Sequence, residues 1–201
     1  MADAGRVIGG RARGIRLRAP GPGTRPLADR VKETLFAILE PDLGGAAVLD
    51  LFAGSGAAGI EAASRGAGRV VLVERDPGAL AAIAANLEAT RLAGPSVRVV
   101  RSEVLRYLDG PASADGPFTI VVVDPPYADR PALLAVLERL GSARPPGRDV
   151  LADGARVVAK HFWRDQPPAM IGLLASERER RFGETALTFY RRAAGMTRED
   201  G

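Results

Sequence analysis

A short apolar strand that runs into a glycine-rich turn and then into a helix is the feature that most restricts how this chain can fold. Residues 48–59 read Val-Leu-Asp-Leu-Phe-Ala-Gly-Ser-Gly-Ala-Ala-Gly, and residues 60–64 continue with a helical pattern. The glycines let the backbone turn sharply and approach a ligand closely, beside the amino end of a helix. A strand, turn and helix in this order begin a βαβ unit, so the segment predicts an open sheet with a ligand-binding turn.

The alternation of strand and helix continues along the chain. Strands are expected at residues 47–52, 69–74, 97–101, 118–124 and 155–160. Helices are expected at residues 27–39, 60–65, 78–93 and 130–140, and residues 170–176 and 184–191 read as two strands without a clear helix between them. This order predicts a single α/β Rossmann-like domain, with a mostly parallel seven-stranded sheet, helices on both faces and a closing antiparallel hairpin.

Length and composition agree with one compact domain. With 201 residues, 46% of them hydrophobic, the chain can bury a full core without disulfides. Cys is absent, which excludes a thiol nucleophile, a disulfide scaffold and a zinc-cysteine site. No apolar run approaches the roughly 18 residues of a membrane span, and the N-terminus lacks a signal-peptide pattern, so we expect a cytoplasmic protein.

Basic charge is concentrated at the N-terminus. Residues 1–34 carry seven Arg, one Lys and three acids, a balance of +5 against +4 for the whole chain. Residues 6–9 and 14–18 suit the two strands of a short hairpin. An arginine cluster beside a cofactor domain predicts nucleic-acid binding, although a solvated Arg-biased surface is the simpler alternative. The expected RNA contacts are Arg6, Arg11, Arg13, Arg16, Arg18, Arg25 and Arg30.

The charge distribution also suggests how the chain is divided. We expect a basic RNA-contacting arm with its hairpin and helix at residues 1–40, a catalytic core at 41–192 and a flexible tail at 193–201. In this interpretation the arm captures the substrate, and every cofactor contact lies beyond residue 49.

A second motif follows the apolar run at residues 118–123 and reads Asp124-Pro125-Pro126-Tyr127. A buried strand that ends in a carboxylate, a rigid double-proline turn and an aromatic ring can grip a planar group that bears an amine. Pro-Pro alone would also end a strand, which is the simpler explanation. At about 5% Pro per position, however, the four residues together are expected by chance in roughly one in a thousand chains of this length.

The glycine motif alone leaves the cofactor open. Gly54, Gly56 and Gly59 fit the dinucleotide fingerprint, and Glu74 follows 20 residues after Gly54, where a ribose-binding acid would lie. S-adenosylmethionine is favoured over NAD because Asp50 would repel a pyrophosphate but attract an ammonium group. A dehydrogenase would also need a substrate domain and usually an acid or base, whereas this chain is short and has one His.

Taken together, the motifs resemble the bacterial 16S rRNA guanine-N2 methyltransferases that modify position 966, a family of class I S-adenosylmethionine-dependent methyltransferases. The similarity runs from Arg6 to about Arg191. Many methyltransferases share the glycine turn, and those that act on exocyclic amines share the Pro-Pro-Tyr turn. The N-terminal motifs narrow the resemblance to this family. The matching segments are residues 6–14, 24–26, 29–33, 49–56, 59–62, 64–66, 124–127 and 182–185.

The resemblance implies roles for particular residues. Glu74 would hold the ribose hydroxyls, Glu103 would lie near the adenine amine, and Asp50 would lie near the methionine end. The implied cofactor-binding residues are Asp50, Phe52, Gly54, Ser55, Gly56, Glu74, Arg75, Glu103 and Val104. The implied catalytic residues are Asp124, Pro125, Pro126 and Tyr127. No metal is expected.

The implied reaction is an in-line displacement of methyl from a sulfonium by the guanine N2 amine, whose lone pair is delocalised into the ring. Asp124 and the Pro125 carbonyl would each accept one amine hydrogen and aim the lone pair at the methyl group, which can lower a barrier by several kcal/mol. Tyr127 would stack on the extruded base, worth roughly 1–3 kcal/mol. The partner would be 16S rRNA, the small ribosomal subunit or an assembly intermediate, and the enzyme a monomer.

Four further features lie outside these motifs. Where relatives are expected to carry a glutamate, this chain has Lys160, which is a candidate RNA contact instead. His161 lacks a ligand cluster, Phe162 and Trp163 are expected to pack or anchor a loop, and residues 177–181 are expected to form a solvated turn.

Two rival functions fit the same motifs. One is a methyltransferase of this fold that acts on DNA or a protein amide. The other is a non-catalytic RNA-binding module.

Overall fold

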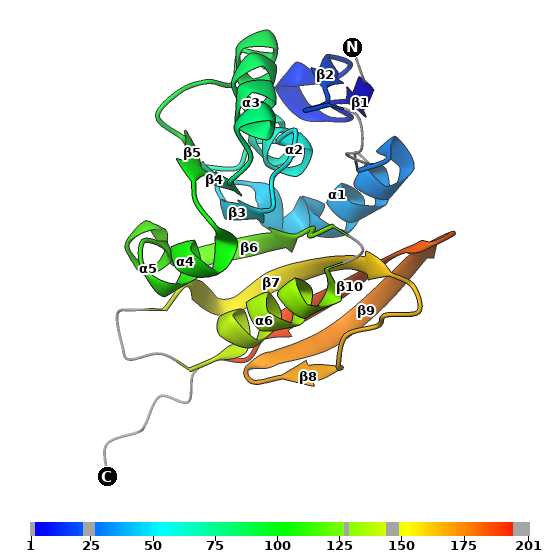
Figure 1. The fold of residues 1–201 in the computed structure, drawn as a ribbon, viewed down its shortest axis with the longest axis vertical. Coiled ribbons are helices and arrows are strands. Elements are labelled where there is room, and N and C mark those ends of the chain that lie inside the picture. The colour runs from blue at the N-terminus through cyan, green and yellow to red at the C-terminus, as the bar shows by residue number, and fades with distance from the viewer. Residues whose placement is uncertain (1–2, 22–26, 127–128, 144–148, 195–201) are drawn as a thin grey trace.

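The computed structural model describes residues 3–21, 27–126, 129–143 and 149–194, shown in Figure 1. The helices are η1 (Gly10–Ala12, a 3₁₀ turn), α1 (Asp29–Leu43), α2 (Ala57–Ser64), α3 (Pro77–Thr90), α4 (Val104–Asp109), α5 (Ala112–Asp115) and α6 (Arg130–Gly141). The strands are β1 (Asp3–Arg6), β2 (Arg16–Arg18), β3 (Ala47–Leu51), β4 (Arg69–Glu74), β5 (Val97–Arg101), β6 (Phe118–Val123), β7 (Leu151–Phe162), β8 (Met170–Ile171), β9 (Leu174–Phe182) and β10 (Thr185–Arg192).

The main sheet has the order β5-β4-β3-β6-β7-β10-β9-β8 in the described part of the chain. Its first five strands are parallel, and β10, β9 and β8 are antiparallel to their neighbours. The central parallel strands are apolar runs because both of their faces are covered. The α/β fold and the parallel order predicted from the sequence are therefore confirmed.

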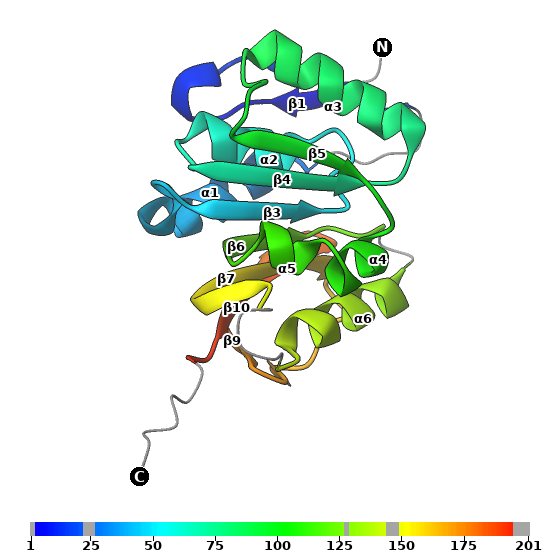
Figure 2. The same cartoon turned by 90° about the vertical axis from the view of Figure 1, so that its left-hand side faces the viewer.

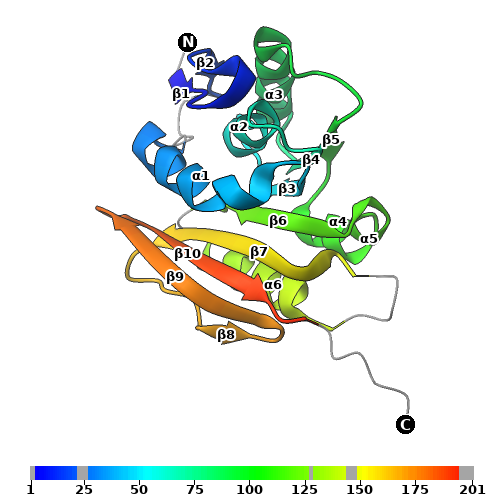
Figure 3. The same cartoon turned by 180° about the vertical axis from the view of Figure 1, so that it is seen from behind.

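Helices cover both faces of this sheet, and side chains alternate between two cores. Val48, Leu72 and Ile120 face the core formed with α1, α2 and α3. Leu49 and Val121 face the core formed with α4, α5 and α6. In Figure 1 α6 lies in front of the sheet, and in Figure 3, seen from behind, α1 lies in front of it. The turned view in Figure 2 shows β3, β4 and β5 side by side beneath α3.

The C-terminal end of the sheet differs from the prediction. Residues 170–176 were expected to be one strand, but Gly172 has φ +56°, and a turn there separates β8 from β9. The sheet therefore has eight strands in the described chain, one more than expected. Residues 177–181, predicted to be a solvated turn, lie within β9, and residues 178–181 pair with β10. Charged side chains are tolerated there because they are exposed, and because beyond β9 the sheet has only the two-residue strand β8, which pairs with Leu174 and Ala175.

Two short helices between β5 and β6 were not predicted. α4 and α5 bury Val104, Tyr107, Leu108 and Ala112 against the sheet. The Tyr107 hydroxyl donates to Asp115, 2.8 Å away. Helices of six and four residues are too short to give a helical periodicity, which explains why the sequence pattern missed them.

The N-terminal hairpin forms as expected but begins earlier in the chain. β1 ends at Arg6, and pairing continues where the Val7 amide donates to Ile15 and the Gly14 amide donates to Val7. The hairpin is not a free arm, because Ala4, Val7, Ala12 and Leu17 are buried in the same core as α1 and α2. Among the described residues, no helix has both the length and the apolarity that crossing a membrane would require.

Candidate active site

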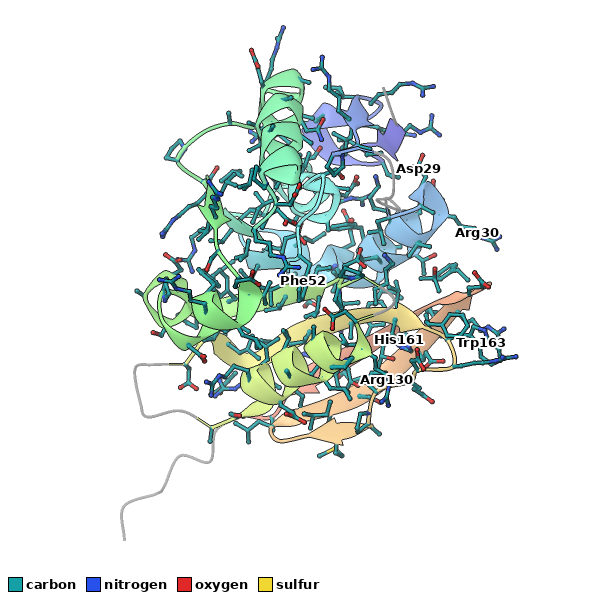
Figure 4. All side chains as sticks on the ribbon, in the orientation of Figure 1. Asp29, Arg30, Phe52, Arg130, His161 and Trp163 are labelled. Carbon is teal, nitrogen blue, oxygen red and sulfur yellow. The ribbon has the colours of Figure 1, made fainter. Side chains whose placement is uncertain are left out.

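The glycine turn lies at the carboxyl end of β3 and leads into α2. Phe52 adopts a left-handed backbone conformation with φ +61°, and Gly56, the N-cap of α2, has φ +78°. A Cβ on Gly59 would lie 2.8 Å from the Leu72 side chain, so glycine is required there for α2 to approach β4. Phe52 lies near the centre of the molecule in Figure 4. A strained non-glycine residue at such a turn is typical of a ligand site.

Asp50 lies beneath this turn and is almost completely buried. Its carboxylate accepts a hydrogen bond from the Gly59 amide at 2.8 Å. Burial raises the pKa of Asp50 to about 7, the Gly59 amide opposes the rise, and the nearby carboxylates of Asp124 and Glu74 add to it. This acid would therefore gain from a cationic ligand beside it.

Glu74 ends β4 and organises the turn. One of its oxygens accepts from the Gly54 amide at 2.8 Å, and the other accepts from the Arg75 and Asp76 amides at 2.7 and 2.9 Å. A carboxylate has about four acceptor sites, so about one is left for a ligand hydroxyl. Asp76 in turn caps α3 by accepting from the Ala79 amide.

Glu103 and Arg75 form an exposed ion pair at the rim of the site, with Arg75 Nη1 2.9 Å from Glu103 Oε1. Glu103 occupies the N-cap position of α4, but its side chain does not cap the helix. The buried Val104 follows directly. Together the three residues place a charged rim beside an apolar wall.

Asp124, Pro125 and Pro126 follow β6 and face the same space. Lys160, two residues before the end of β7, donates to Asp124 Oδ1 at 2.5 Å. Lys160 faces the cavity, because the parallel register of β6 and β7 brings it beside Asp124, and its contact with RNA stays a prediction. Burial raises the pKa of Asp124, and the Lys160 ammonium opposes that rise.

A cavity of about 780 Å³ brings the two motifs together. Of the residues predicted from the sequence it is lined by Asp50, Phe52, Gly54, Ser55, Glu74, Arg75, Glu103, Val104, Asp124, Pro125 and Pro126. Gly56 does not line it, since it packs toward Ile60, Leu72 and Ile83. Tyr127 lies outside the described residues.

The sequence analysis missed several residues of this cavity. Ser102 and Leu105 flank Glu103, and Asp129 caps α6 by accepting from the Ala132 amide at 3.1 Å. The N-cap position of Asp129, just after the double-proline turn and before a helical pattern, was the available signal. Pro20, Gly21 and Leu27 also line the cavity, so the segment before residue 49 forms part of its wall, and the expectation that the cofactor contacts lie beyond residue 49 stays a prediction.

The predicted RNA-contacting arginines are on the surface. Arg6, Arg11, Arg13, Arg16, Arg18 and Arg30 are exposed, and Arg25 lies outside the described residues. Figure 4 shows Arg30 pointing outward at the start of α1. Arg6 also forms an ion pair with Asp29 at 3.5 Å.

Buried polar groups fasten the hairpin backbone to the core. Glu61 of α2 accepts from the Ile8 and Gly9 amides, both at 2.7 Å. Asn86 of α3 exchanges two hydrogen bonds with the Arg18 backbone and donates a third to the Ser55 carbonyl of the glycine turn. The hairpin is thus connected to the cavity through one buried side chain.

The remaining polar and aromatic residues near the site have structural partners. His161 is buried, and its ring nitrogens lie 2.8 Å from Thr188 Oγ1 and the Phe162 carbonyl. Trp163 stacks under Arg181, whose guanidinium lies 3.6 Å from the ring centroid, and the Trp163 amide donates to Glu184. These contacts agree with the expected loop-anchoring role. No cluster of metal-ligating side chains occurs within the described ranges.

Comparison with known proteins gives three informative matches. The family model described as "Conserved hypothetical protein 95" matches residues 5–191. Ribosomal RNA small subunit methyltransferase D of Escherichia coli (strain K12) is 40% identical over 190 residues, 94% of this chain and 90% of that protein. A solved Escherichia coli structure, provisionally described as a methyltransferase, has a TM-score of 0.80 and 35% identity, with 94% of this chain and 98% of that chain covered.

A more distant structure shares the fold alone. It is an RNA methyltransferase from Salinibacter ruber in complex with S-adenosyl-L-homocysteine, with a TM-score of 0.61 and 17% identity over 87% of this chain and 97% of that one. Fold and site together define a Rossmann-like methyltransferase domain. The matches in sequence are more specific. The chain belongs to the family of ribosomal RNA small subunit methyltransferase D and its relatives.

Proposed function

We propose that this protein transfers a methyl group from S-adenosylmethionine to the exocyclic N2 amine of a guanine in 16S rRNA, at the 966-type site. The observation that carries the proposal is the shared cavity, which places the glycine turn with Glu74 and the Asp124-Pro125-Pro126 turn around one space. Family membership supports the same reaction, because the Escherichia coli relative is named as a small-subunit rRNA methyltransferase.

The residues around the cavity fit S-adenosylmethionine. Asp50 suits the ammonium group of the methionine end, and its buried carboxyl is stabilised in the charged form by a cation. Glu74 has about one acceptor site for a ribose hydroxyl, so binding both hydroxyls requires one backbone amide to give way. Val104 offers an apolar wall for the adenine, with Glu103 beside it. When bound, this cofactor supplies an activated methyl group on a sulfonium.

The acceptor half of the cavity supplies two hydrogen-bond acceptors for an amine. Asp124 and the Pro125 carbonyl each accept one amine hydrogen, which aims the nitrogen lone pair at the methyl group. Positioning of this kind lowers the activation barrier by several kcal/mol. The proton released from the methylated amine passes to solvent or to a nearby carboxylate. Tyr127 is proposed as the stacking partner of the extruded base.

The exposed arginines of the hairpin and of α1 are proposed to bind the rRNA backbone. Residues 1–40 would thus supply the RNA contacts, residues 41–192 the chemistry and residues 193–201 a tail. We further propose that the enzyme acts as a cytoplasmic monomer, on naked 16S rRNA, on the assembled small subunit or on an assembly intermediate.

Methyl transfer to defined acceptors tests this function. The purified protein is incubated with radiolabelled S-adenosylmethionine and, in parallel, with small subunits that lack the modification, naked 16S rRNA, duplex DNA and bulk protein. We expect label in the subunit or its RNA, and N2-methylguanosine in the nucleoside digest. Label only in DNA or protein would favour a rival substrate, and binding of RNA without transfer would indicate a non-catalytic module.

A further inference from the structure

The feature that the proposed reaction does not yet explain is the ion pair between Lys160 and Asp124. The two side chains are 8% and 22% exposed, and Lys160 Nζ lies 2.5 Å from Asp124 Oδ1. Both residues line the cavity. Lys160 is one of only two lysines in a chain with 26 arginines. A cation so close to the acceptor carboxylate must affect how that carboxylate binds an amine.

Strand register determines this contact. β6 and β7 are parallel neighbours in which Val123 pairs with Ala159. Asp124, the first residue after β6, therefore lies beside Lys160, which is still within β7 and pairs with Leu187 of β10 on its other side. Burying a lysine is costly unless its charge is paired. The resemblance to the family implied a glutamate at this position, which would place two carboxylates together instead.

We propose that Lys160 is a positioning residue for methyl transfer: it keeps Asp124 ionised and fixes the Oδ1 oxygen, which leaves Oδ2 free to accept the amine hydrogen. The inference rests on the proposed function. An ionised carboxylate only accepts hydrogen bonds, whereas a protonated one has a donor that would face the N–H of the amine. The single contact on Oδ1 also limits rotation of the carboxylate.

Removal of the Lys160 charge should favour protonation of Asp124. Burial already raises the pKa of this carboxyl, and the Lys160 charge and hydrogen bond are what oppose the rise. The carboxylate of Asp50 lies close enough to repel it. The other charged side chains that line the cavity are Glu74, Arg75, Asp76, Glu103 and Asp129, and Arg130 lies in a small hollow beside the proline turn.

The test compares pH profiles of single-turnover methyl transfer for Lys160→Met and Lys160→Arg. A methionine has similar length and no charge, so the acid limb of the profile should move up by about one pH unit or more, because the Asp124 pKa rises. At a fixed pH on the acid limb, turnover should fall by about tenfold for each pH unit of that shift, and it should recover at high pH. Arginine keeps the charge, so its acid limb should stay close to that of the unmodified protein.

Arg192→Met is a matched control. Arg192 has the same side-chain exposure of 8%, pairs with Asp149 at 2.7 Å and does not line the cavity. This variant should lose stability without a shift of the acid limb. An acid limb that does not move in Lys160→Met would overturn the proposal. An equal loss of rate at every pH would also overturn it, because it would indicate that Lys160 contacts the substrate or only supports the fold.

Carbon NMR titration of the Asp124 carboxyl separates this inference from the proposed function. The measurement needs neither RNA nor turnover. We expect the titration midpoint of Asp124 to rise in Lys160→Met, and a midpoint equal to that of the unmodified protein would contradict the inference. If Lys160→Met does not fold, Lys160→Gln replaces it in both measurements. Absence of methyl transfer by the unmodified protein would instead overturn the function, while the titration still reports on the ion pair.

Discussion

Asp50 gives the site a pH dependence that can be measured on the cofactor alone. Its pKa of about 7 means that the carboxyl is protonated at lower pH and charged at higher pH. An ammonium group binds the charged form better, so cofactor affinity should rise as pH increases through about 7 and fall by up to about tenfold per unit below it. Calorimetric titration with S-adenosylhomocysteine between about pH 5.5 and 7.5 measures this slope.

Asp50→Asn is the control for this prediction. The amide cannot ionise, so affinity should be lower at neutral pH and nearly independent of pH over the same range. A flat profile in the unmodified protein would mean that Asp50 does not meet the ammonium group.

Asp124 should govern turnover and leave cofactor binding almost unchanged. We expect Asp124→Asn to retain part of the activity, because its amide oxygen still accepts one hydrogen bond. Asp124→Ala should reduce turnover by about a hundredfold or more, the range seen when one positioned hydrogen-bonding group is removed. Single-turnover kinetics and calorimetry with S-adenosylhomocysteine distinguish the two effects.

The alanine variant also removes the carboxylate that pairs with Lys160, so its melting temperature must be compared with that of Asp124→Asn. Near-normal turnover by a folded alanine variant would remove Asp124 from the mechanism.

Single residues of the site could be predicted where they belong to a local motif. Glu74 and Asp124 end predicted strands, Asp50 lies near the end of another, and the structure brings all three to one cavity. The Lys160 contact could not be predicted, because it depends on the register of two strands 36 residues apart. Pro20 and Leu27 were missed for a similar reason, since nothing in their local sequence says how the hairpin is docked.

At the scale of elements, α2 links the hairpin to the glycine turn. Glu61 of α2 is completely buried and accepts from the Ile8 and Gly9 amides and from Arg65 Nε. Glu61→Ala would leave two partly buried amides without their acceptor. Each costs about 1–3 kcal/mol, so we expect a loss of roughly 2–6 kcal/mol in the free energy of unfolding. Thermal and urea unfolding measure it, and hydrogen exchange should increase at residues 7–15.

Glu40→Ala is a suitable comparison, because Glu40 pairs with the same Arg65 at 2.6 Å but has a side chain that is 57% exposed. An exposed ion pair contributes about 0–1 kcal/mol, so this variant should be nearly neutral. Equal stability of the two variants would show that the buried contacts do not hold the hairpin.

Long elements with a clear hydrophobic pattern were the easiest to predict from the sequence. The parallel strands and the long helices follow from apolar runs and helical periodicity, and α1, α3 and α6 form close to the predicted ranges. The antiparallel end was less predictable, because charged residues in an exposed strand resemble a turn. β9 is a strand because its backbone pairs with β10, which local sequence does not reveal.

At the scale of the whole molecule, the hairpin and the catalytic core share one hydrophobic interior. Deletion of residues 1–20 would remove the buried side chains of Val7, Ala12 and Leu17 from this interior and would remove the partners of Glu61 and Asn86. Such a truncation would therefore alter the stability of the protein and the glycine turn as well as RNA binding. Substitution of exposed arginines is the cleaner test of the proposed RNA surface.

Replacing Arg11, Arg13 and Arg18 together with Gln should weaken RNA binding and make it less dependent on salt. All three side chains are exposed, so the fold should tolerate the change. If each arginine neutralises one phosphate, the slope of log affinity against log salt should decrease by about 0.7–0.9 for each one lost. Affinity for 16S rRNA or small subunits is measured over a salt series, and S-adenosylhomocysteine binding should stay unchanged because none of the three lines the cavity.

A second triple variant, with Arg91, Arg101 and Arg106 changed to Gln, separates local contacts from total charge. These arginines are also exposed but lie in and around the β5 edge of the sheet, so the net charge falls by the same amount. If the hairpin contacts the phosphates, only the first variant should lose salt slope, since charges farther than roughly 10 Å are screened at moderate salt. Equal losses in both variants would mean that RNA responds to the overall charge. An unchanged slope in the first variant would move the RNA-contacting surface away from the hairpin.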